Sequence, residues 1–160
     1  MSTTLSYRTA ILRVQELLLQ VDGIERCYSA ASSEPGEAFP EGAPETHPGE
    51  AAAIIYPPEE EGYLLTNPHH SRRYRLPVEI SLPISPMGVS MPDLLDLFDQ
   101  VIDLLAANVT LGARIEHCLY AGDMRMEMRT WAGESPTHMS ILFGLNIKEA
   151  ANITTVGIGS

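Results

Sequence analysis

Cysteine and histidine are the residues of this sequence that could serve as nucleophiles or metal ligands. Cys27 and Cys118 are isolated, and the histidines stand at positions 47, 69, 70, 117 and 138. Zinc and redox sites usually show short spacings such as Cys-x-x-Cys or His-Glu-x-x-His, and neither occurs in this sequence. Adjacent His69 and His70 would point to opposite faces of a strand, which is poor geometry for chelation. We therefore expect inert, buried cysteines, no metal site and no cofactor.

Motifs for phosphate binding and for serine nucleophiles are also missing from the sequence. A phosphate loop requires Gly-x-x-x-x-Gly-Lys, and a hydrolase nucleophile elbow requires Gly-x-Ser-x-Gly. The sequence contains neither pattern, and its only lysine is Lys148. These observations disfavour an enzyme and favour a protein that works through its surfaces.

Charged residues offer interaction chemistry instead. Arg72, Arg73 and Arg75 form the one basic cluster, which could pair with an acidic partner surface or merely balance the acidic loop. The net charge is −11, and residues 31–62 hold eight glutamates with no lysine or arginine. Such a chain should not bind nucleic acid by counterion release, but it could line a passage through which DNA slides. The simpler alternative is that the acidic residues maintain solubility.

The first element that must position these residues is a helix, predicted over Leu5–Gln20 from apolar residues at helical spacing. Asp22-Gly23 is a plausible end of that helix. Leu12 and Leu19 fall outside its main apolar arc and form a second, narrow apolar stripe. This stripe is either a pair of ordinary exposed leucines or a contact between subunits.

A second helix is predicted over Pro92–Ala107, with Pro92 in its first turn. Its apolar residues cover about half of the circumference, which is wider than one sheet face requires. Asp96, Asp99 and Asp103 lie on the opposite half. The wide apolar half could make a second buried contact; the alternative is a normal core helix with a solvated acidic face. The three aspartates are candidate interface residues.

Alternating apolar and polar residues predict the strands of a mixed, mainly antiparallel sheet. The expected strands are Ile24–Ala30, Ala51–Tyr56, Arg72–Ile84, Arg114–Tyr120, Met124–Thr130 and His138–Lys148, whereas Glu59–Asn67 is ambiguous. Pro77 and Pro83 predict an edge position or bulges for the third of these strands. The last three strands are expected to form a meander, with a tight turn at residues 121–123.

The chain has 160 residues, which suits one domain. We expect an α+β domain over residues 1–148, in which two helices pack on the sheet. Residues 32–50 are predicted to be a long, mobile acidic insert, and residues 149–160 a poorly ordered tail. No apolar run is long enough for a membrane helix, and no signal peptide is visible, so a reduced intracellular environment is expected.

The order of these elements resembles that of the tail terminator, or tail completion, proteins of long-tailed bacteriophages. The resemblance rests on the opening helix that runs into a short strand over Ile11–Tyr28, and on the step from the second helix into a strand over Asn108–Ile115. Between them lie a variable loop and the long strand that ends near Ile84. The match covers about residues 5–148, and it concerns pattern and topology rather than a catalytic signature.

This resemblance implies a virion protein of the tail or neck that assembles in the host cytoplasm. It would form a homo-oligomeric, hexameric ring at the head-proximal end of the tail tube, end tube growth and join the head connector or stopper protein. DNA would pass through the lumen without specific binding. Two alternatives stay open: another head–tail neck component, or a soluble ligand-binding α+β domain.

Overall fold

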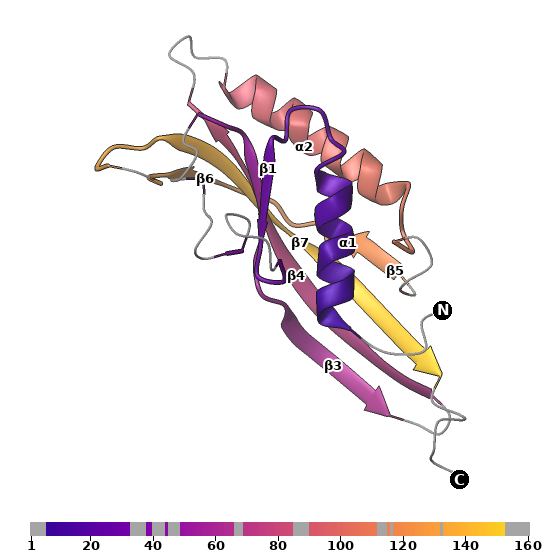
Figure 1. Ribbon diagram of the computed structural model, residues 1–160. Helices are drawn as coiled ribbons and strands as arrows, with labels where there is room; N and C mark the ends of the chain where they lie inside the picture. The colour runs from indigo at the N-terminus through magenta and orange to yellow at the C-terminus, as the bar shows by residue number, and fades with distance from the viewer. Residues whose placement is uncertain are drawn as a thin grey trace.

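The computed structural model describes residues 6–32, 38–39, 44, 49–65, 69–84, 90–111, 115, 117–131 and 133–152. These residues form two helices and seven strands, and the predicted α+β class is confirmed (Figure 1). In chain order the elements are α1 (Tyr7–Leu18), β1 (Arg26–Ser29), β2 (Ala52–Ile55), β3 (Glu59–Leu65), β4 (His69–Pro83), α2 (Ser90–Ala106), β5 (His117–Tyr120), β6 (Arg125–Arg129) and β7 (His138–Asn152).

Two long antiparallel strands, β4 and β7, form the centre of the sheet. They pair along their whole lengths, from His69 opposite Asn152 to Pro83 opposite His138. Strands β2 and β3 both pair with the edge of β4 that faces away from β7, and β1 extends the sheet by pairing in parallel with β2. Strands β5 and β6 both pair with the edge of β7 that faces away from β4. The sheet is therefore mixed but mainly antiparallel, as predicted.

Both helices cover the same face of this sheet (Figure 1). The apolar arc predicted for the first helix is buried, and Ser6 caps α1 by accepting a hydrogen bond from the Thr9 amide. Helix α1 packs on β1 and β2, whereas α2 packs on β4, β5 and β7. The core lies between the helices and alternate residues of the central strands, including Tyr74, Val78 and Phe143. The opposite face, which we call the open face, has no helix on it among the described residues.

The edge position predicted from Pro77 and Pro83 is wrong, because β4 is central. The backbone amide and carbonyl of Gly144, opposite Pro77 in β7, bond to residues of the β5–β6 segment. Pro77 therefore belongs to a non-hydrogen-bonded pair, and its missing N–H would point away from β7. That side of Pro77 lies at the break between β2 and β3, where its carbonyl accepts a hydrogen bond from the Tyr56 amide at 3.0 Å. A gap in the neighbouring strand thus accommodates the proline.

The meander predicted for the last three strands is also wrong. Strands β5 and β6 do not pair with each other but lie end to end along β7, opposite residues 145–148 and 138–142. Residues 121–123, predicted as a hairpin turn, and Met124 instead bulge outward opposite Phe143 and Gly144. Gly122 has a φ of +82°, a conformation that glycine adopts easily. The sequence signal for a reversal of the chain therefore marks a bulge in one edge.

The C-terminal tail, the ambiguous segment Glu59–Asn67 and the acidic insert are the least regular parts of the predicted chain. The predicted tail at 149–160 begins too early, because β7 continues to Asn152, and residues 153–160 lie outside the described residues. The ambiguous segment Glu59–Asn67 contains β3, which ends at Leu65. Most of the predicted mobile insert, at 33–37, 40–43 and 45–48, lies outside the described residues, so its mobility stays a prediction.

Candidate interaction surface

The structure divides the predicted basic cluster between the two faces of the sheet. Arg72 lies on the helix side, where its Nε is 2.6 Å from Glu149 Oε2 and its guanidinium lies 3.4 Å above the Tyr7 ring. Arg73 and Arg75 lie on the open face, because alternate residues of a strand point to opposite sides. Arg72 is therefore a structural residue with its own intramolecular partner, and it does not share a face with Arg73 and Arg75.

One half of the open face is closed by contacts within the chain. We call this the covered half and define it by Glu79 and Ser81 of β4 with Arg129 and Trp131. Arg129 donates two hydrogen bonds to the Glu79 carboxylate, from Nε at 2.9 Å and from Nη2 at 2.8 Å. The Tyr56 hydroxyl donates a third at 2.7 Å, and Trp131 Nε1 donates to the Ser81 hydroxyl at 3.0 Å. The Glu79 carboxylate is thus compensated although its side chain is fully buried.

The sequence-based reasoning missed the Glu79 network. Glu79 stands at a polar position of an alternating strand, which predicts exposure rather than burial. Burial, and to a smaller extent the hydrogen bond to Glu79, raises the pKa of the Tyr56 hydroxyl far above its usual value. Tyr56 therefore acts as a hydrogen-bond donor throughout the physiological pH range. Only the pairing of β2 with β4 and of β6 with β7 reveals that Tyr56 and Arg129 meet at Glu79.

The other half of the open face has a different arrangement of charge. We call it the exposed half after the exposed Arg73, and its other members, Arg75, Lys148 and His117, are half-buried. Arg73 of β4 stands opposite Lys148 of β7, and Lys148 stands opposite His117 of β5, so the three form one row across the sheet. Like charges directly opposite each other destabilise a sheet. The structure gives Arg73 no ion pair with any described side chain, and this residue is exposed.

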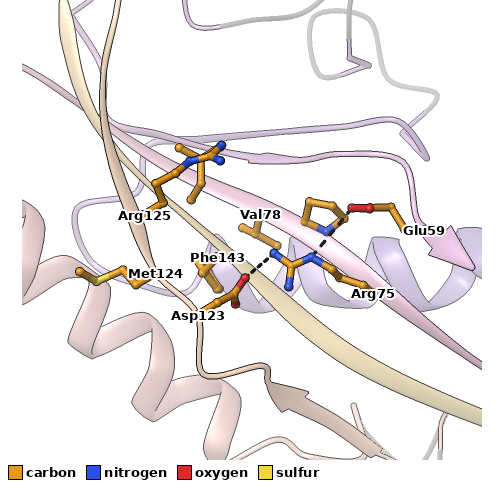
Figure 2. A pocket seen from close by; sticks show the side chains of 9 residues that line it. Glu59, Arg75, Val78, Asp123, Met124, Arg125 and Phe143 are labelled. Atoms are coloured by element: carbon orange, nitrogen blue, oxygen red, sulfur yellow. Dashed lines mark ion pairs between the residues drawn. The ribbon is translucent and has the colours of Figure 1, made fainter. Parts of the chain in front are cut away.

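Arg75, one position further along the same face, is neutralised within the chain (Figure 2). Its Nη2 is 2.6 Å from Asp123 Oδ2, and its Nε is 3.9 Å from Glu59 Oε1. The guanidinium lies across Gly144, where a Cβ atom would come within 1.9 Å of Nη1. These side chains border a shallow pocket of about 450 Å³ beside the β5–β6 bulge. Arg75 therefore has a structural role, because it binds Asp123 of the bulge and lies across Gly144 of β7.

Asp123 connects the bulge to the central strands. Its Oδ1 accepts a hydrogen bond from the Gly144 amide at 3.0 Å, while Oδ2 faces Arg75. Burial alone would raise the pKa of Asp123, but the hydrogen bonds from Arg75 and Gly144 outweigh it and hold the pKa below its usual value. Asp123 is thus charged at neutral pH and has a structural role.

The predicted interface residues of α2 are all exposed. Asp96, Asp99 and Asp103 fall within an arc of about 60° when projected at 100° per residue. Leu95 and Met91 are also exposed, so apolar surface adjoins the carboxylates. The helix contains four aspartates and no lysine or arginine. The outer side of α2 is therefore acidic along its length, as predicted.

The predicted leucine stripe of α1 is only partly present. Leu19, which caps the helix, has 42% of its surface exposed, but Leu12 is half-buried. Gln15, three residues after Leu12, is buried, and its Nε2 donates to the Cys27 carbonyl at 2.8 Å. The two leucines therefore do not form one continuous exposed surface. Leu19 alone remains available to a neighbour.

Within the described residues, no group of three or more histidine, cysteine or acidic side chains is arranged to hold a metal ion. Both cysteines are buried, and burial raises the pKa of the Cys118 thiol to about 12.

No helix in the described part of the chain is both long and apolar enough to cross a membrane. The acidic outer side of α2 and the exposed side chain of Arg73 are thus the candidate interaction surfaces that the described residues offer. No known family model matches the sequence, and the comparison with curated proteins gives no significant match.

Proposed function

We propose that this protein is a structural component of a phage tail, forming a hexameric ring at the head-proximal end of the tail tube. The ring ends polymerisation of the tube and provides the joint to the head connector. It acts by surface complementarity, without bond chemistry. DNA passes through its lumen without specific binding.

The observation that carries this proposal is the one-sided architecture of the domain. Both helices lie on one face of the sheet, and the opposite face presents the exposed Arg73. A surface of one chain that complements a different surface of the next gives head-to-tail contacts, which close into a ring when the rotation permits. The order of the elements, which resembles that of tail terminators, supports the same conclusion.

The test combines oligomeric state with an assembly assay. Native mass spectrometry and electron microscopy of the purified protein should show rings of defined stoichiometry. Added to polymerising tail-tube protein, the protein should bind one end of each tube and stop its growth. A chain that stays monomeric at every concentration and never binds tube ends would contradict the proposal. Rings that bind only the head connector would instead indicate a different neck component.

A further inference from the structure

Besides the side chains described above, the sheet presents a backbone edge at β6. We propose that this edge, formed by the outward-facing backbone of Met126 and Met128, is the docking site for residues 153–160 of a second copy of this chain. The segment adds one strand to the sheet of its neighbour. This inference rests on the proposed ring, because it names the contact that joins one subunit to the next.

The direction of the backbone groups along β6 follows from the pairing of β7. The Gly144 carbonyl accepts a hydrogen bond from the Ala121 amide, so the even-numbered residues of β7 direct their backbone groups toward β5 and β6. Every second residue of β6, from Arg125 onward, stands opposite an even-numbered residue and belongs to a hydrogen-bonded pair. The amides and carbonyls of Met126 and Met128 therefore point away from β7, and none of the described residues bonds to them. These are the unpaired groups that an added strand requires.

The edge strands β1, β3 and β5 are each blocked at some point by the chain itself. At β1 the Ser29 carbonyl accepts a hydrogen bond from the Phe39 amide at 3.0 Å, and at β5 the Cys118 amide donates to the Val109 carbonyl at 2.7 Å. The register of β3 shifts within the strand, and such an irregularity discourages further pairing. Strand β6, over Arg125–Arg129, has an unbroken register and contains neither proline nor glycine. It is therefore the edge that best accepts another strand.

The side chains of β6 favour a neutral, partly apolar partner. Met126 packs against the core on the helix side of the sheet, and Met128, on the same side, has 56% of its surface exposed. On the open side, Glu127 Oε1 is 2.9 Å from Arg125 Nε, and Glu127 Oε2 is 3.2 Å from Arg129 Nη1. The charges of this strand are thus paired with one another. An incoming strand meets an apolar row on one side and compensated charges on the other.

The chain carries a segment of matching chemistry after β7. Residues 153–160 have no charged side chain, and five of the eight are β-branched, which favours a strand. Val156 and Ile158 stand two positions apart, as Met126 and Met128 do. In an added strand both would lie on one face, where they would pack against the methionines of β6.

The contact must join two copies, because this segment cannot reach β6 of its own chain. Strand β6 pairs with residues 138–142 of β7, and the arrow of β7 points away from it (Figure 1). Ten residues of strand separate Leu142 from Asn152, or about 33 Å at 3.3 Å per residue. The eight residues 153–160 span at most about 29 Å when fully extended. A contact between two different elements is heterologous, so it can repeat around a ring.

A charge placed in the segment tests its role in assembly. Val156→Asp puts a carboxylate against the methionines and should raise the concentration needed for half-assembly by roughly tenfold or more. Thr155→Asp is the matched control, because its side chain would lie on the other face of the added strand, and it should change that concentration by less than about twofold. Thermal melting checks that both variants fold.

A substitution in β6 tests the acceptor edge. Met128→Pro removes an N–H that points away from β7, so it should block the added strand without breaking a bond to β7. Met128→Val keeps this N–H and is the control. We expect an increase of roughly tenfold or more in the half-assembly concentration for the proline variant alone. If the proline variant does not fold, the exchange experiment on unmodified β6 provides the test of this edge.

Amide hydrogen exchange detects the contact directly. In the assembled wild type, the Met126 and Met128 amides should exchange at least about tenfold more slowly than in the dilute monomer. The Glu127 amide, directed toward β7, should be protected in both states. A synthetic peptide of residues 153–160, added to the Val156→Asp chain, should protect the two methionine amides without restoring rings, because it fills the edge but joins no subunits.

The outcomes distinguish failure of this contact from failure of the proposed function. Wild-type protein that never assembles overturns the ring, and the edge contact then stands only if the peptide protects Met126 and Met128. Rings that form equally well from Val156→Asp, or methionine amides that stay unprotected in wild-type rings, overturn the strand contact and leave the ring standing. Protection of these amides in the dilute monomer would show that the edge is covered within one chain, which also overturns it. Weaker assembly of Val156→Asp with protection in wild-type rings establishes the contact.

Discussion

In the covered half of the open face, Glu79 meets Arg129 and Tyr56 of the same chain, whereas in the exposed half Arg73 stands opposite Lys148, and Lys148 stands opposite His117. Both halves belong to the same two central strands, and both alternate polar residues toward the open side. They differ in the side chains that the edge strands place next to β4 and β7. Strand β6 places the Arg129 guanidinium on the buried Glu79 carboxylate, whereas β5 places His117 opposite Lys148.

This contrast separates the buried Glu79 carboxylate, which is compensated within the chain, from Arg73, which is exposed and has no ion pair with a described side chain. A buried ion pair costs desolvation on both sides, so each member depends on the other remaining in place. An exposed charge costs little to keep, and its removal changes stability little. Substitutions in the covered half should therefore lower stability more than substitution of Arg73 does.

Replacement of the same residue type in each half tests this separation most directly. Arg129→Met leaves the Glu79 carboxylate buried without its main partner and should lower the free energy of unfolding by about 3 kcal/mol. Arg73→Met, at the exposed position, should change it by less than about 0.5 kcal/mol. Urea denaturation of the two variants measures both values. Equal losses would show that the two halves are not energetically distinct.

The boundary between the halves lies at Gly144. A substitution there should lower the free energy of unfolding less than Arg129→Met does. Gly144→Ala places a methyl group where the Arg75 guanidinium now lies, so Arg75 must leave Asp123. Because Asp123 is partly exposed, we expect a loss of about 1 kcal/mol. Gly62→Ala is the matched control, since nothing lies within 4 Å of its Cβ position. A double variant with Arg75→Ala should lose less than the sum of the single changes. Full additivity would mean that the Arg75–Asp123 contact is not what the methyl group disrupts.

The pH dependence of stability should show the smallest effect. The pKa of Asp123 is lowered in the folded chain, so its contribution is fully present above the unfolded pKa, near 4, and is lost as the pH falls through the folded pKa. Solvent screening limits that contribution to below about 1 kcal/mol. The difference in unfolding free energy between wild type and Asp123→Asn should therefore shrink as the pH falls below about 4. A difference that stays constant over this range would exclude a role for the charge.

Much of the secondary structure follows from local patterns. The helices begin and end within about two residues of their predicted bounds, because helical periodicity and caps are encoded in neighbouring residues. The alternation of β4 and β7 likewise predicts which of their side chains point to the core. The acidic side of α2 follows from the same local reasoning. These features can be predicted without knowing which strands pair with each other.

Tertiary structure decided the features that depend on partners distant in the sequence. Pro77 predicts an edge, yet it lies in a central strand because the neighbouring strand is interrupted beside it. Glu79 predicts exposure, yet it is buried because Arg129, fifty residues away, is brought next to it. The arginines at 72 and 73 are adjacent in sequence but lie on opposite faces, so only strand pairing shows that Arg73 shares a row with Lys148. The physical reason is that side-chain direction is a local property, whereas strand order and burial are set by the whole chain.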